Sequence, residues 1–153
     1  EWYQKLIRMV GWKLSAMAPA SSAISNLIMS DQGKQDVRRS NCCVMDCGRQ
    51  GVRLYFYQKG LLFAKRGLEF CDTEERLLFE LEKIWDYYQT CYPGYIPELI
   101  YVTGGKRNPL LEAAITERLE AECCDWTKLL DNSQEPVRGL ISAEAAGMTF
   151  WKG

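Results

Sequence analysis

The chain has 153 residues, of which 47% are hydrophobic and 25% are charged, and its formal net charge is −1 at pH 7. This length favours one domain, and a net charge so near zero lacks the electrostatic attraction that binding of nucleic acid requires. No apolar run approaches the roughly 20 residues that span a bilayer. We therefore expect neither nucleic acid as a partner nor direct insertion into a membrane.

The chain has seven cysteines and no histidine, which limits the disulfides, metal sites and catalytic groups that it can form. An odd number of cysteines with two adjacent pairs does not resemble a disulfide framework, and no CxxC pair is present to nucleate a zinc site. Without histidine, the commonest metal ligand and the Ser-His-Asp and Cys-His arrangements are excluded. We expect reduced, mostly buried thiols in a cytosolic protein. The cysteines are Cys42, Cys43, Cys47, Cys71, Cys91, Cys123 and Cys124.

Three short elements and a link are predicted before residue 41. Residues 1–10 carry apolar side chains at helical spacing, and residues 12–18 alternate as in a strand. Because residue 1 already resembles the middle of a helix, we expect the chain to be cut from a longer one. Ser21 and Ser22 would cap a short helix, and residues 31–40, which lack apolar periodicity, would form an exposed link. The apolar stripe of the short helix would be Ala23, Ile24, Leu27 and Ile28.

Three consecutive strands are predicted between Asn41 and Phe70. Residues 42–45 form a short apolar run, residues 52–57 alternate, and Lys59-Gly60 would turn the chain into a strand over 61–70. This segment therefore reads as one strand followed by a hairpin.

Asp46, Gly48 and Gly51 separate the first two of these strands. An Asp at the end of a buried strand, followed by glycines, can bring backbone N–H groups and one carboxylate to a single point, as phosphate sites require. The same Asp-x-Gly sequence is also common in ordinary turns, where Asp bonds its own backbone and Gly supplies positive φ. The turn alone leaves both interpretations open.

Helices and short strands alternate after Phe70. Asp72 and Glu75 have the spacing of a capping box, ahead of a helix that runs to about residue 90. A buried strand over 99–102 would end in Thr103, Gly104 and Gly105.

A second helix follows this double-glycine turn. Asn108 and Pro109 suit its N-cap and first helical position. A short strand around residues 124–126 and a last helix over 140–148 complete the expected order. The inward line of the second helix would be Leu111, Ile115 and Leu119.

This order of elements predicts an α/β fold with a mixed sheet, in which three antiparallel strands precede helix-covered parallel strands. Asp46-Cys47-Gly48 follows the first strand and Thr103-Gly104-Gly105 follows the fourth. Both turns should then lie at one end of the sheet and face each other across a crevice.

Two stretches, VMDCGRQGVRLYFYQKGLLFAKRGLEF and IYVTGGKRNPLLEAAITERL, resemble the second lobe of the actin-like (RNase H-like) fold. Two further segments are similar to the PilM family of type IV pilus assembly proteins and to its type II secretion relative, GspL. They are WDYYQTCYPGYIPELIYVTGG and, near the end of the chain, SAEAAGMTF. The resemblance implies that residues 1–40 are the end of the first lobe with the crossing helix and link. Residues 41–153 would be the second lobe, without its small inserted subdomain.

The resemblance also implies a nucleotide site with two turns, a phosphate turn and an adenosine turn. This chain departs from the family pattern, because Arg49, Gln50, Gly51 and Val52 replace the usual run of Ser or Thr hydroxyls. The first phosphate loop would lie in the missing lobe. We therefore expect no cofactor here, with ATP and magnesium binding only if the first lobe were present. The implied site residues are Asp46, Gly48, Gly51, Thr103, Gly104 and Gly105.

The function implied by the resemblance is that of a non-catalytic scaffold in a type IV pilus or type II secretion assembly platform. Its partners would be membrane-anchored pilus or secretion assembly proteins, bound at the cytoplasmic face of the plasma membrane, and the oligomeric state stays open. Five of the eight tyrosines would either mark a partner surface or pack at strand edges and helix ends. These five are Tyr55, Tyr57, Tyr87, Tyr92 and Tyr95.

The alternative function is a nucleotide-binding ATPase or phosphotransferase of the actin and sugar-kinase superfold, seen as a fragment. Asp46 would then hold magnesium or a metal-bound water, and the Gly48 and Gly51 amides would meet phosphate oxygens. Lys106 or Arg107 would stack on the base, unless they are solvated loop charges.

Overall fold

The computed structural model describes residues 19–29, 35–69 and 73–129, together with the single residues Lys5, Met9 and Gly11. The strand predicted over 12–18, the helix predicted over 140–148 and most of the helix predicted within 1–10 lie outside these residues. The described elements, in chain order, are α2 (Ala20–Met29), α3 (Gln35–Arg39), β1 (Asn41–Cys47), β2 (Gly51–Gln58), β3 (Leu61–Glu69), α4 (Glu74–Cys91), β4 (Leu99–Thr103), α5 (Pro109–Leu119), β5 (Glu122–Asp125) and a 3₁₀ turn, η1 (Trp126–Leu129).

The strands form a single five-stranded sheet in the order β3-β2-β1-β4-β5. β1 pairs with β2 and β2 with β3 in antiparallel fashion, whereas β1–β4 and β4–β5 are parallel. Each parallel connection passes through a helix, α4 before β4 and α5 before β5, as parallel strands require. The predicted mixed α/β sheet is therefore confirmed.

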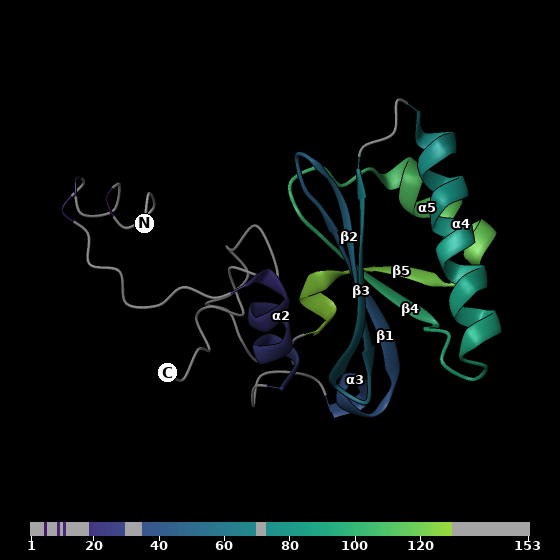
Figure 1. Cartoon of the computed structure of the whole chain (residues 1–153), viewed down its shortest axis with the longest axis horizontal. Coiled ribbons are helices and arrows are strands. Elements are labelled where there is room, and N and C mark those ends of the chain that lie inside the picture. Colours follow the sequence, from purple (N-terminus) through teal and green to yellow (C-terminus); the bar gives the residue numbers. More distant parts are fainter. Residues whose placement is uncertain are drawn as a thin grey trace.

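Helices cover both faces of this sheet, with α2 on one side and α4 and α5 on the other (Figure 1). β1 lies at the centre, and every residue from Cys42 to Cys47 is buried. A strand covered on both faces is expected to be apolar throughout instead of alternating, which explains the run of residues 42–45.

The sheet separates two apolar clusters. On the α4 and α5 side, alternate residues of β1 and β2 pack against the helices; this cluster includes Cys43, Met45, Val52, Leu54, Phe56, Leu81, Trp85, Ile100, Leu111 and Ile115. On the α2 side, the other residues of the same strands pack against α2 and η1; this cluster includes Ile24, Leu27, Ile28, Cys42, Val44, Tyr55, Tyr57, Tyr101, Trp126 and Leu129.

The two long helices begin at hydrogen-bonding caps. The N-cap of α5 is Asn108, whose side chain accepts a hydrogen bond from Leu110 N at 3.0 Å, with Pro109 at the start of the helix, as predicted. The N-cap of α4 is Thr73, whose Oγ1 accepts from Arg76 N at 3.3 Å. The prediction of Asp72 as the cap is wrong by one residue, and Asp72 itself lies outside the described residues.

Two predictions before β1 also need correction. α2 begins at Ala20, so Ser21 and Ser22 lie in its first turn instead of capping it. The predicted exposed link contains the short helix α3, in which Val37 is buried. This helix is also tied to α2, because Arg38 Nε donates to the Ile28 carbonyl near the end of α2 at 3.1 Å.

The β2–β3 hairpin turns at Lys59 and Gly60 as predicted, and both residues have positive φ, at 50° and 78°. This is the backbone pattern of a type I′ turn, which suits the twist of antiparallel strands. The register shifts further along, where Tyr57 pairs with Leu62 and Phe56 with Ala64. Phe63 is therefore an extra residue, forming a β-bulge in β3.

Candidate functional site

The ends of β1 and β4 lie side by side at one end of the sheet, and the two glycine-bearing turns follow them. Asp46 is paired with Thr103 in the parallel register. One strand continues into residues 48–50 and the other into residues 104–108. We call the ends of β1 and β4, together with the two turns that follow them, the corner.

The two turns of the corner are in direct contact. Lys106 N donates a hydrogen bond to the Cys47 carbonyl at 3.1 Å. Gly104 has φ of +97°, and a Cβ placed on it would lie 2.5 Å from the Cys47 carbonyl oxygen and 2.8 Å from Asp46 Oδ1. The predicted meeting of the two turns is confirmed, and Gly104 is required there because the opposing backbone leaves no space for a side chain.

Asp46 places one carboxylate at the corner. The residue is 8% exposed, and its Oδ2 lies 3.7 Å from Arg53 Nη1 on β2. Arg53 was not among the predicted site residues, although it stands directly opposite Asp46 in the β1–β2 register. The signal was present in the sequence, because residues 46 and 53 lie at equal distances from the centre of the turn between them.

Gly48 and Gly51 close this turn on itself. Gly48 N donates to the Gly51 carbonyl at 3.0 Å. Gly51 has φ of +150°, and a Cβ there would lie 2.1 Å from the Leu68 carbonyl oxygen. Gly51 is thus explained by the close approach of β3. Among the predicted glycines, Gly105 is different, because a Cβ placed on it would meet no atom within 4 Å apart from those of its chain neighbours.

Basic side chains surround the openings at the corner. Arg49 and Lys106 line a shallow cavity of about 600 Å³ together with Cys47 and Gly105. A second cavity, of about 580 Å³, lies between residues 48–53 and 67–69. The corner is therefore open to solvent, with exposed cations at its rim.

Arg107 does not face this opening. Its Nε and Nη2 each lie 2.9 Å from a carboxylate oxygen of Glu112, and Nη1 also bonds Asp125. The hydrogen bonds that the guanidinium donates to Glu112, and then those it donates to Asp125, raise the pKa of Arg107 above its ordinary value. Since the whole guanidinium is engaged in holding α5 and β5 together, the prediction that Arg107 could stack on a base is not supported by this geometry.

The buried thiol of Cys47 is the nearest potential nucleophile. Burial raises its pKa to about 12, and the neighbouring Asp46 carboxylate acts in the same direction. The thiol is therefore protonated at neutral pH and a poor nucleophile or metal ligand. Within the described ranges, no group of three or more His, Cys, Asp or Glu side chains is arranged to hold a metal ion.

The five tyrosines that were candidates for a partner surface divide into two groups. Tyr55, Tyr57 and Tyr95 are buried and belong to the core, as the packing alternative predicted. Tyr87 and Tyr92, on and just after α4, are 48% and 42% exposed. Only these two remain as candidates for a partner surface.

Comparison with known proteins gave matches in structure alone. Neither the family models nor the curated proteins contain a match to this sequence. Among solved structures, a chain of a PilM-PilN type IV pilus biogenesis complex superposes with a TM-score of 0.70 at 15% identity, over 95% of this chain. The fold is that of the actin-like ATPases. At this level of identity the likeness establishes the fold alone.

Two further actin-like structures agree. One is a Bacteroides thetaiotaomicron protein of actin-like ATPase fold and unknown function, with a TM-score of 0.59, 13% identity and 98% of this chain covered. The other is the ethanolamine utilization protein EutJ from Carboxydothermus hydrogenoformans, with a TM-score of 0.53, 12% identity and 84% covered. This actin-like chain spans 55%, 51% and 57% of the three proteins, or about half their length.

Among the described helices, none combines the length and the apolar character that a membrane span needs.

Proposed function

We propose that this chain is part of a non-catalytic actin-like scaffold, which binds assembly proteins of a type IV pilus or related secretion platform at the cytoplasmic face of the membrane. The observation that carries the proposal is the self-contained hydrogen bonding of the corner. Lys106 N is directed to Cys47 and Gly48 N to Gly51, and the Asp46 carboxylate faces Arg53.

A nucleotide would need these same groups. Phosphate binding in turns depends on backbone N–H groups that point at the ligand, yet two such groups here donate to carbonyl oxygens of the chain itself. A magnesium ion would have to compete with the Arg53 guanidinium for Asp46, and the turn from 48 to 51 has no hydroxyl side chain. The described residues of the corner fit Mg-ATP poorly, which supports binding of proteins over catalysis.

The pilus assignment draws support from the PilM-PilN structure, in which a chain of this fold is part of a pilus biogenesis complex. By this analogy, the partner of this chain is a membrane-anchored assembly protein, and the chain reaches the membrane through that partner. The competing function is a nucleotide-dependent ATPase or phosphotransferase whose other lobe completes the site.

Calorimetric titration distinguishes the two functions. Mg-ATP is titrated into the full-length protein, with Asp46→Ala as the matched variant. We expect no heat of binding and no shift in melting temperature for either protein. Micromolar binding that is lost in Asp46→Ala would contradict the scaffold proposal and support the enzyme.

Membrane fractionation tests the partner half of the proposal. Tagged full-length protein should sediment with the inner membrane of its own cells and should cross-link to a pilus or secretion assembly protein there. It should move to the supernatant when that assembly protein is deleted. A protein that stays with the membrane after the deletion, or never reaches it, would overturn the assignment.

A further inference from the structure

β3 is an edge strand in the described part of the chain. It pairs with β2 on one side, and no described strand lies on its other side. Most of its nine residues are exposed. An edge strand presents backbone N–H and C=O groups that can pair with an added strand, and proteins usually keep such edges short, covered or highly charged.

The bulge at Phe63 shapes a groove between β3 and the last turns of α4. The Phe63 ring centroid lies 4.2 Å from that of Tyr95 and 5.0 Å from that of Tyr92. Beside these rings is an open groove of about 550 Å³, which we call the β3 groove. It is lined by Leu62, Phe63, Lys65, Arg66, Tyr87 and Tyr92, with Ala64 and Tyr88.

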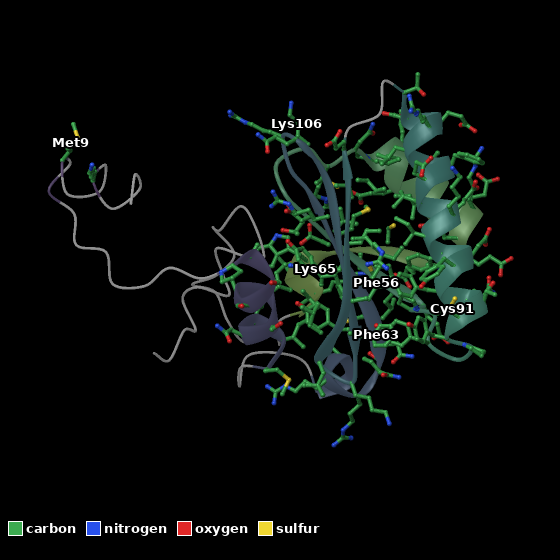
Figure 2. The ribbon with its side chains drawn as sticks, viewed as in Figure 1. Met9, Phe56, Phe63, Lys65, Cys91 and Lys106 are labelled. Carbon is green, nitrogen blue, oxygen red and sulfur yellow. The ribbon has the colours of Figure 1, made fainter. Side chains whose placement is uncertain are left out.

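Large apolar side chains are exposed along this groove. Leu62 is 39% exposed and Phe63 is 38% exposed, next to the half-exposed Tyr87 and Tyr92. Aromatic residues gathered at a surface depression are typical of the centre of a protein interface. The groove also lies away from the corner, because Lys106 and Phe63 are at opposite ends of the sheet (Figure 2).

The charge of the groove favours an acidic occupant. Lys65 and Arg66 are the charged residues among those that line it, and no carboxylate does so. They are adjacent in β3, so Arg66 lies on the α4 side of the sheet, opposite Leu54, and Lys65 on the α2 side, opposite Tyr55. The Arg66 guanidinium lies 5.7 Å from the centre of the Tyr88 ring, which orients it over the groove wall. Two cations without a lining carboxylate would attract a negatively charged segment.

Tyr88 gives an independent indication that the groove is incomplete. It is 3% exposed and lines the groove, yet its buried hydroxyl has no hydrogen-bond partner within the described residues. Buried polar groups are nearly always paired in native structures. A backbone or carboxylate oxygen brought into the groove, with a small shift of the Tyr88 ring, would supply the missing acceptor.

We propose that the β3 groove binds an extended, acidic segment of a partner protein, which adds to the sheet as a strand next to β3. Carboxylates of the segment would face Lys65 on the α2 side of the sheet, and the alternate aromatic or aliphatic side chains would pack against Phe63 and Tyr92 on the α4 side. Backbone hydrogen bonds give affinity in this mode of recognition, and alternate side chains give specificity. The inference rests on the proposed scaffold function and names the surface that performs it.

The test uses a fluorescein-labelled ten-residue peptide in which Val and Phe alternate with Asp and Glu. Binding to the full-length protein is followed by fluorescence anisotropy. We expect saturable binding that Lys65→Glu weakens by about fivefold or more, through loss of one attraction and gain of one repulsion. The matched control is Lys128→Glu, which makes the same change of charge at an exposed lysine just after β5, the opposite edge strand.

Two altered peptides separate charge from backbone pairing. Lysine in place of the acidic residues should abolish binding, and so should N-methylation of alternate backbone amides. Hydrogen exchange should slow at residues 61–69 when the peptide binds. Equal weakening by Lys65→Glu and Lys128→Glu, or unchanged exchange in β3, would overturn the proposal.

Three other outcomes show whether the groove proposal or the scaffold function is wrong. If Lys65→Glu dissociates a dimer of the protein alone and the peptide does not bind, the groove holds a second copy of this chain and the proposal is wrong. If the assembly protein still cross-links to Lys65→Glu as it does to wild type, this inference fails while the scaffold function stands. If no assembly protein cross-links even to wild type, the scaffold function itself fails.

Discussion

Gly104 illustrates how one absent side chain decides the geometry of the corner. Its positive φ and the nearness of the Cys47 carbonyl both follow from β4 ending directly beside β1. Gly105, one residue later, is open to solvent and has no positive φ. Two adjacent glycines of one motif therefore have different physical roles.

Gly104→Ala is predicted to lower the free energy of unfolding by about 2–4 kcal/mol. A Cβ would collide with backbone atoms of Cys47 and would strain the left-handed conformation. Gly105→Ala is the matched control and should change stability by less than about 0.5 kcal/mol, as exposed substitutions usually do. Urea denaturation of both variants measures the difference, and equal losses would show that the contact between the two turns is not important for stability.

At the scale of elements, the hydroxyl of Tyr57 links α2 to the sheet. It lies 3.2 Å from Ser25 Oγ and 3.3 Å from the Ser21 carbonyl, in the first turns of α2. The sequence predicted α2 and its four buried residues, because their spacing is helical. It did not predict this bond, since it joins residues 32 and 36 positions apart.

Tyr57→Phe is predicted to lower the free energy of unfolding by about 1 kcal/mol, because it removes the part-buried hydrogen bonds that the Tyr57 hydroxyl makes with Ser25 and with the Ser21 carbonyl. Tyr88→Phe serves as the comparison. Its hydroxyl is buried without a described partner, so we expect no loss or a small gain. Chemical denaturation of the two variants tests this order, and a larger loss for Tyr88→Phe would show that its hydroxyl has a partner after all.

At the scale of the whole molecule, buried thiols lie on both faces of the central strand. Cys42 packs on the α2 side and Cys47 on the α4 side. Burial raises the pKa of each to about 12, from an ordinary value of 9.0. The core therefore holds acidic groups that can ionise only when it opens.

The free energy of unfolding should accordingly fall as the pH rises above 9. In that range the unfolded chain has lost these protons while the folded chain keeps them. The free energy of unfolding therefore falls by about 1.4 kcal/mol per pH unit for each thiol. Below pH 9 the two thiols should have no such effect. Denaturation curves between pH 8 and 10.5 measure this slope. The double variant Cys42→Ala/Cys47→Ala should make it less steep, although burial of Cys43 also raises the pKa of that thiol and preserves part of the slope. An unchanged slope would contradict the assignment.

Local sequence determined the elements whose signal lies within a few residues. The apolar run of β1, the Lys59-Gly60 turn, the Asn108-Pro109 start of α5 and the stripe of α2 were all predicted and are all present. These features depend on period, turn chemistry and capping, which act between near neighbours. The short α3 was missed because its sequence holds one apolar residue, Val37, which gives no period.

Tertiary structure alone decided what the corner and the β3 groove contain. The order of elements predicted that the two glycine turns would meet, but only their packing showed that the amides of Gly48 and Lys106 bond to the chain itself. Two other features likewise depend on distances between segments remote in sequence. One is the pairing of Arg107 with Glu112 and Asp125. The other is the bulge that brings Phe63 onto Tyr92 and Tyr95. Periodicity reports which face of an element is buried, whereas the partners of a polar or aromatic group are set by how whole elements pack.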